Sequence, residues 1–144
     1  MAETVSTRLE VRWGECDPAG IVYHPSFIDW FSVARMHFLA EHGIQYMREF
    51  HDTGITIVVT DVACKYILPL RAEEHIEIVA KLVECSRTRL HFEYDVLKSD
   101  GSLSARGSTR HAFVKHGVIQ PVNLQKASPE LWTRIASLPT LARA

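Results

Sequence analysis

The residues best suited to chemistry gather in one stretch near the N-terminus, WGECDPAGIVYHPSFIDW at residues 13–30. An Asp-Pro-Ala-Gly turn signal leads there into an apolar, helix-like segment, so the carboxylate of Asp17 lies a few residues before a helix N-terminus. Free N–H groups at a helix N-terminus attract negative charge. A carboxylate that attacks a carbonyl or activates water, beside amides that hold the resulting oxyanion, suits acyl transfer.

Two starting points are open for this helix. His24 can precede Pro25 in the first turn, or Ser26 can be the N-cap with Asp29 completing a capping box. Asp29 is therefore interpreted as a capping residue rather than a catalytic one. If the helix begins near Tyr23 and His24, backbone N–H groups there can bind a developing oxyanion, and the imidazole of His24 is a second candidate group.

The elements that must position these residues follow from periodicity. Residues 5–13 alternate between apolar and polar side chains, which predicts a strand with one buried face that includes Trp13. Residues 27–40 are nearly all apolar, which predicts a helix covered on more than one side, with Gly43 as its stop. Four more strand-like segments follow, at residues 55–68, 76–82, 90–96 and 103–115.

Ser128 and Pro129 then predict a short C-terminal helix. The element order favours an α+β fold with one helix on a largely antiparallel sheet of five strands. A helix that is apolar on most faces suits a curved sheet wrapped around it. Because a single sheet leaves an edge and an outer face to protect, we expect dimerisation by sheet extension.

Composition narrows the functional class. A chain of 144 residues fits one domain, which we expect to span residues 1–144. The net charge of −1 gives no electrostatic footprint for nucleic acid. No apolar run approaches the roughly 20 residues that span a bilayer, so no membrane partner is expected. Three cysteines without close pairing and no secretory signal predict a cytoplasmic protein.

Several kinds of site have no signal in this sequence. It contains no HExxH, no paired CxxC and no other metal-ligand spacing, and it lacks a GxSxG elbow, a P-loop and a dinucleotide GxGxxG. We therefore expect neither a metal nor another cofactor. Cys16 has no recognisable base beside it and is interpreted as a packing residue rather than a nucleophile.

The stretch at residues 13–30 resembles the hotdog-fold acyl-CoA thioesterases of the 4-hydroxybenzoyl-CoA thioesterase family. The Tyr23-His24 pair is similar to a Tyr-His pair in the related short-chain acyl-CoA branch. Weaker similarity continues to about Lys115. The matching residues are Gly14, Cys16, Asp17, Pro18, Ala19, Gly20, Ile21, Val22, Pro25 and Trp30.

This resemblance implies a hotdog fold, in which a five-stranded, largely antiparallel sheet wraps one long central helix. It implies hydrolysis of an acyl-CoA to free acid and CoA, with Asp17 as nucleophile or general base. The amides at Tyr23 and His24 would polarise the thioester carbonyl, and the side chain of His24 is a further candidate. Relatives of this kind form homodimers with active sites at the dimer interface, and many pair these dimers into homotetramers.

The resemblance also suggests residues for substrate binding. Relatives that act on 4-hydroxybenzoyl-CoA carry a helix carboxylate where this chain has Ser32, so an aryl or a short acyl chain is expected instead. Arg87 and Arg89, at a turn that is basic in relatives, are the candidates for the CoA phosphates. Thr60 and Asp61 are weaker candidates that would face the site across the dimer.

Three other functions compete with this one. An acyl-carrier-protein thioesterase would use the same chemistry with a protein partner, for which a basic docking patch is expected. A hotdog module that binds acyl-CoA without turnover would keep the fold, although the presence of Asp17 argues against it. A hydratase or dehydratase would need an Asp and His close together in a different motif, which this sequence does not contain.

Overall fold

The computed structural model describes residues 3–117 and 120–141. Each long periodic segment of the sequence has become a strand or helix, and short helical turns join them. The elements in chain order are β1 (Thr4–Glu10), η1 (Trp13–Glu15), α1 (His24–Glu41), α2 (Tyr46–Glu49), η2 (His51–Thr53), β2 (Ile55–Tyr66), β3 (His75–Cys85), β4 (Arg89–Lys98), β5 (Leu103–Lys115), α3 (Leu124–Ala127) and α4 (Pro129–Ala136).

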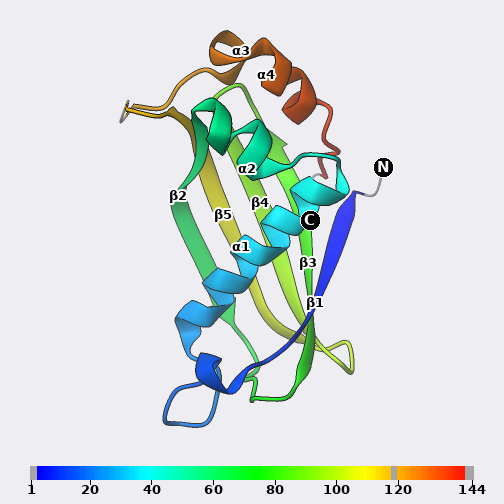
Figure 1. Cartoon of the computed structure of the whole chain (residues 1–144). Helices are drawn as coiled ribbons and strands as arrows, with labels where there is room; N and C mark the ends of the chain where they lie inside the picture. Colours follow the sequence, from blue (N-terminus) through cyan, green and yellow to red (C-terminus); the bar gives the residue numbers. More distant parts are fainter. Residues whose placement is uncertain (1–2, 118–119, 142–144) are drawn as a thin grey trace.

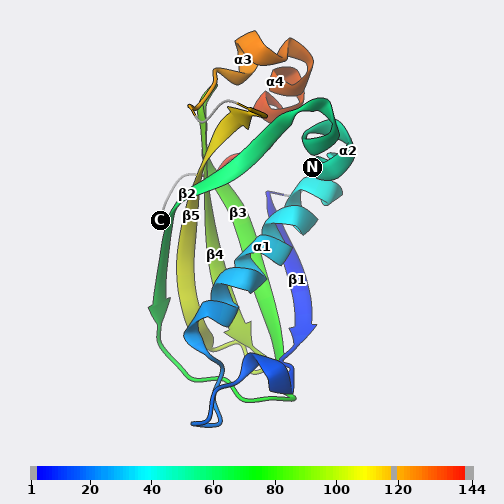
Figure 2. The same cartoon turned by 60° about the vertical axis from the view of Figure 1, so that its left-hand side comes forward.

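The five strands form one antiparallel sheet in the order β1-β3-β4-β5-β2, so β1 and β2 are its edges. The long helix α1 lies across one face, which we call the inner face, and the sheet curves around it (Figure 1, Figure 2). The short helices α3 and α4 cover the end of the sheet that holds the C-terminal end of α1 (Figure 1). The expected α+β architecture is confirmed.

Aromatic side chains fix α1 against the sheet. The ring of Phe31 stacks on Tyr94 of β4, with ring centroids 4.5 Å apart and nearly parallel planes. Beside Tyr94 on β5 is Gly107, where an added Cβ would lie 2.4 Å from the Phe31 ring and 2.8 Å from the Ala63 carbonyl oxygen. Gly107 is therefore required for the close approach of Phe31, and full burial of such a ring stabilises the fold by about 2–3 kcal/mol.

One prediction about α1 is wrong for the chain alone. Its buried side chains form a single stripe, Ser26, Phe27, Trp30, Phe31, Ala34, Phe38 and Leu39. Val33 and Met36 lie outside this stripe and are 46% and 42% exposed. A single sheet covers only one side of a helix, so the apolar residues on the opposite side have no cover within the described residues of one subunit.

The boundaries of the first strand also differ from expectation. β1 ends at Glu10, and Trp13 belongs to η1 with 82% of its surface exposed, so it is not on the buried face. The stop at Gly43 is confirmed, since this glycine follows α1 with a φ of +80°, a conformation that favours glycine. The start of α4 is confirmed as well, because the Ser128 hydroxyl accepts a hydrogen bond from the Leu131 N–H.

Candidate active site

The carboxylate of Asp17 is held by a tight turn between η1 and α1. The Gly20 N–H donates to the Asp17 carbonyl at 2.9 Å, and Gly20 has a φ of +82°, which a residue with a side chain rarely adopts. One carboxylate oxygen, Oδ1, accepts a hydrogen bond of 2.8 Å from the Ala19 N–H. Within the described chain, no hydrogen bond or ion pair occupies the other oxygen, Oδ2. The turn thus fixes Asp17 and leaves one oxygen for a substrate or water.

Backbone hydrogen bonds anchor this turn to the rest of the molecule. The Asp17 N–H donates to the Ile21 carbonyl at 2.9 Å, and Cys16 and Val22 form an isolated β-bridge that closes the loop. The Val22 N–H donates in turn to the carbonyl of Leu70, which follows β2 in the chain. Cys16 is partly buried against the core, in line with the packing role inferred from the sequence.

Helix α1 begins at His24, with Tyr23 as its N-cap residue, so the first of the two possible starts is correct. Ser26 is inside the helix and buried, and its hydroxyl donates to the Glu15 carbonyl at 3.1 Å. Asp29 is exposed on the helix and does not cap it. The capping box does not form because the helix begins before Ser26. Pro25 suits the first turn, where a backbone N–H has no partner within the helix and the missing N–H therefore breaks no hydrogen bond.

The first amides of α1 differ in what they bind. The Tyr23 N–H donates to the Glu15 carbonyl at 2.8 Å, and the Ser26 N–H donates to the Tyr23 carbonyl at 2.9 Å. Pro25 has no N–H. The His24 N–H makes no hydrogen bond to any residue in the described ranges. It is therefore the amide at this helix end that can bind an incoming oxygen atom.

Glu15 is a supporting residue that the sequence analysis did not identify. Its carbonyl accepts from Tyr23 and Ser26, and its carboxylate accepts from the Trp30 indole at 2.7 Å. Burial acts to raise the pKa of Glu15, but hydrogen bonds from the Arg12 backbone, the Trp30 indole and the Arg12 guanidinium outweigh it and lower this pKa. Glu15 stays ionised and ties the turn to α1.

Asp17 and His24 line the same pocket, which has a volume of about 360 Å³. Tyr66, at the end of β2, lines it too, and its hydroxyl donates to the His24 carbonyl at 2.9 Å. Burial and the neighbouring Cys64 raise the pKa of Tyr66 to about 12, so the hydroxyl keeps its proton at neutral pH. The remaining lining residues are apolar: Ile21, Val22, Phe27, Ile67, Leu68, Pro69 and Leu70.

The structure does not bring the other candidate residues into this pocket. Ser32 is half-buried on α1, about two turns beyond His24. Thr60 and Asp61 are exposed at a bulge in β2, where the Thr60 hydroxyl donates to the Asp61 carboxylate at 2.9 Å.

Arg87 and Arg89 are exposed at the turn between β3 and β4. This turn lies beside α3, to which it is joined by a 2.7 Å hydrogen bond from the Leu124 N–H to the Arg87 carbonyl. The loop between η1 and α1, which contains Asp17, lies at the opposite end of the sheet, where α1 begins (Figure 1). Within one subunit, the proposed CoA-binding arginines and the candidate catalytic carboxylate therefore lie at opposite ends of the sheet.

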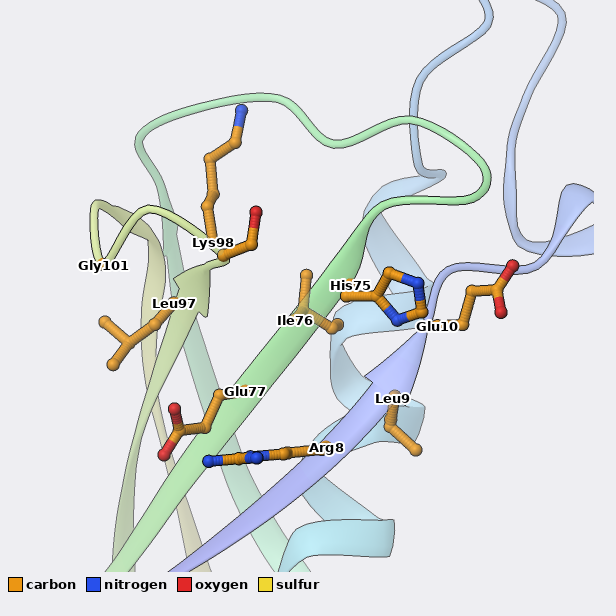
Figure 3. A pocket seen from close by; sticks show the side chains of 10 residues that line it. Arg8, Leu9, Glu10, His75, Ile76, Glu77, Leu97, Lys98 and Gly101 are labelled. Carbon is orange, nitrogen blue, oxygen red and sulfur yellow. The ribbon is translucent and has the colours of Figure 1, made fainter.

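A second, larger pocket of about 510 Å³ lies on the outer face of the sheet, where β1, β3 and β4 meet (Figure 3). The side chains of Arg8 and Glu77 point toward one another there. Lys98, at its border, forms an ion pair of 3.3 Å with Glu74. The lining of this pocket carries charges of both signs, and it shares no residue with the pocket of Asp17.

The described residues contain no cluster of histidine, cysteine and carboxylate side chains able to hold a metal ion. Among these residues there is also no helix long and apolar enough to cross a membrane.

Comparisons with known proteins agree with this fold. The chain matches the thioesterase-like superfamily over residues 11–138. This match extends past Lys115, where the resemblance noted above ended. A putative esterase of Aquifex aeolicus is 35% identical over 112 residues, which cover 78% of this chain and 86% of the relative. A putative acyl-CoA thioesterase of Bacillus subtilis, YneP, is 26% identical over 125 residues, with 87% and 90% covered.

The fold is also that of solved thioesterases. A DHNA-CoA thioesterase from Staphylococcus aureus superimposes with a TM-score of 0.87 at 26% sequence identity, and the match covers 92% of this chain and 89% of the other. The hotdog arrangement and the thioesterase resemblance are thereby confirmed. On its sequence, fold and pocket, the chain belongs to the thioesterase-like superfamily and is a thioester hydrolase.

Proposed function

We propose that the protein hydrolyses an aryl or short-chain acyl-CoA to the free acid and CoA. The observation that carries this proposal is that Asp17 and His24, whose backbone N–H is unbonded among the described residues, line one pocket. The carboxylate supplies a nucleophile or base, and the helix amide supplies a donor for the oxyanion. The apolar lining of the pocket suits an acyl group rather than a charged nucleotide.

Two routes are compatible with this geometry. In the first, an oxygen of Asp17 attacks the thioester carbonyl, the C–S bond breaks, CoA leaves as its thiolate, and water cleaves the resulting mixed anhydride. In the second, Asp17 takes a proton from a water molecule, whose oxygen attacks the same carbonyl. The resulting oxyanion then re-forms the carbonyl as the C–S bond breaks, and CoA leaves as its thiolate, which takes up the proton from Asp17. In both routes negative charge develops on the carbonyl oxygen, and the His24 N–H stabilises it.

We propose further that the active unit is a homodimer formed through β2. This edge strand carries exposed apolar side chains, with Val59, Val62 and Tyr66 at 47%, 44% and 46% exposure. Symmetric pairing of two β2 edges would bury them and extend the sheet. Because β2 would pair antiparallel with its copy, Arg87 and Arg89 of the partner subunit would come to the end that holds Asp17, where they can bind the CoA phosphates.

The test is release of free CoA thiol from benzoyl, hydroxybenzoyl, phenylacetyl and aliphatic acyl-CoA thioesters, by the native chain and by Asp17→Asn. We expect turnover by the native chain and a loss of about 100-fold or more in kcat for the variant, with little change in KM. Asp29→Asn is the matched control, because Asp29 is exposed and outside the pocket.

Turnover that survives Asp17→Asn would show that the catalytic assignment is wrong. If the native chain cleaves no CoA thioester, the proposal fails, and an acyl-carrier-protein substrate becomes the next to assay. Light scattering of the native chain tests the assembly, which is contradicted by a monomer that retains full activity.

A further inference from the structure

Arg35, on α1, is a half-buried cation without a carboxylate partner. Its Nη1 donates to the Tyr94 hydroxyl at 3.1 Å, and its Nη2 donates to the Ser32 hydroxyl at 3.3 Å. No carboxylate of the described residues forms an ion pair with Arg35. A guanidinium has five N–H donors and a full charge, and two neutral hydroxyls satisfy only part of both.

The groups behind Arg35 do not supply the missing negative charge. The Tyr94 hydroxyl lies 2.6 Å from the Thr109 hydroxyl, which lies 2.7 Å from Nε2 of His111. Burial raises the pKa of Tyr94, so this phenol stays neutral. Burial and the charge of Arg35 lower the pKa of His111 to about 3, so the imidazole is neutral as well. The network positions Arg35 without neutralising it.

Arg35 lies on the same side of α1 as His24, which lines the pocket. It is eleven residues after His24, which is about three turns and a rise of roughly 16 Å on the same helix face. The hydrogen bond to Ser32 turns the guanidinium back toward the N-terminus by one turn. The distance left between the pocket and the guanidinium is therefore on the order of 10 Å, the length of a short acyl chain or a substituted aryl group.

The edge strand β2 runs from the pocket to the network behind Arg35. Tyr66, which lines the pocket, is followed back along the inner face of β2 by Cys64 and Val62. Val62 is the cross-strand partner of Thr109, which belongs to the network behind Arg35. An acyl group that extended beyond the pocket along β2 would pass Cys64 and Val62 on its way toward the guanidinium.

We propose that Arg35 determines acyl specificity by binding a carboxylate at the far end of the acyl group. The substrate would then be the CoA thioester of a short dicarboxylic acid or a carboxylated aryl acid. This inference rests on the thioesterase function proposed above and names its substrate class. A carboxylate would use the free N–H donors of Arg35 and neutralise its charge, which Ser32 and Tyr94 cannot do.

The experiment compares adipoyl-CoA with hexanoyl-CoA, two substrates of equal chain length that differ in the distal carboxylate. We expect the native chain to prefer adipoyl-CoA in kcat/KM by about 10-fold or more. Arg35→Met should abolish that preference by lowering kcat/KM for adipoyl-CoA to about the value that the same variant shows for hexanoyl-CoA. Arg48→Met is the control, because Arg48 is exposed on α2 and should keep the native preference.

Ser32→Asp provides a second variant that keeps the arginine. The new carboxylate would lie next to the Arg35 guanidinium, neutralise it and repel a dicarboxylic substrate. The preference for adipoyl-CoA over hexanoyl-CoA should therefore disappear in this variant too.

An adipoyl preference that is absent in the native chain, or unchanged in both variants, overturns the inference and leaves the thioesterase function standing. If the native chain cleaves neither thioester but does cleave an aryl-CoA, the inference is overturned and the proposed function stands. Failure on the aryl thioesters as well removes both. A dimer that dissociates in Arg35→Met while substrate preference stays the same would assign Arg35 to a carboxylate of the partner subunit, and this outcome also overturns the inference.

Discussion

The two ends of α1 differ in how completely their polar groups are bonded. At the C-terminal end, the Phe38 carbonyl accepts from the His42 ring, and the Gly43 carbonyl accepts from Arg134 of α4, which also pairs with Glu49. At the N-terminal end, the His24 N–H has no hydrogen-bond partner among the described residues. We call the C-terminal end closed, because its bonded groups stabilise the fold. We call the N-terminal end open, because its unbonded N–H is left for the proposed reaction.

The comparison teaches that the available donor is one particular amide. The helix macrodipole acts at both ends, but at the N-terminal end Glu15 occupies the Tyr23 N–H and a proline follows His24. What remains is a single N–H, close to a carboxylate that its turn holds in place.

The largest effect is expected from removing that N–H. His24→Pro deletes the amide hydrogen, and proline is tolerated at the first position of a helix after the extended backbone of Tyr23. We expect kcat to fall by about 100-fold to 1000-fold, the usual loss for one oxyanion donor. His24→Ala keeps the N–H and should lose less than about tenfold if the amide is the main group. Steady-state kinetics of both variants test this.

Equal losses in the two variants would instead assign the role to the imidazole. Circular dichroism and the unfolding midpoint of His24→Pro provide the folding control, since a damaged helix start would lower both.

A second prediction concerns the interior between the two ends. The pKa of His111 falls to about 3 through burial, the charge of Arg35 and the nearby His91, while the Val58 backbone opposes the shift. In the unfolded chain His111 binds a proton with the usual histidine pKa of about 6.5, whereas in the folded chain it stays neutral down to about pH 3. The free energy of unfolding therefore decreases as pH falls below about 6.5. The free energy of unfolding should drop by about 2 kcal/mol between pH 7 and pH 5 from this group.

Urea unfolding at pH 7 and pH 5 measures the change, and His111→Gln should remove most of it. His75→Gln serves as the control, because His75 is exposed and should leave the pH dependence as it is. An unaltered pH dependence in His111→Gln would mean that other groups cause the loss.

The smallest effect is expected at the closed end of α1. Arg134→Met removes the hydrogen bond to the Gly43 carbonyl and the ion pair with Glu49, two partly exposed interactions. Unfolding stability should fall by about 1–2 kcal/mol, with kcat/KM unchanged. Chemical denaturation and the thiol-release assay measure these quantities. A fall in kcat/KM at constant stability would contradict the separation between the two ends.

The sequence predicted the parts of the molecule that depend on local patterns. Alternation identified the strands, and residues 103–115 match β5 to the residue. Gly43 and Ser128 gave the correct helix boundaries because their conformations depend on neighbouring residues. The turn at Asp17 was also predicted, since Pro18 and Gly20 specify it through backbone geometry.

Contacts between distant parts of the chain could not be predicted in this way. Trp13 continues an alternating pattern, yet it is exposed because the chain leaves the sheet at Glu10. Tyr66 and Arg35 meet their partners across 42 and 59 positions of the chain, and no spacing rule covers such distances. The sequence also could not show that the Tyr23 amide is already occupied by Glu15.

Asp17 and His24 are only seven positions apart in the chain. Closing so short a loop costs little conformational entropy, and these two residues can be held together without a distant segment folding first. Residues proposed to contact the acyl group and CoA lie mostly elsewhere: farther along α1, at the end of β2 and at the turn between β3 and β4. Mutations there can alter the choice of substrate while the residues proposed to cleave the bond are inherited unchanged, so this architecture would allow new specificities to evolve around a constant reaction.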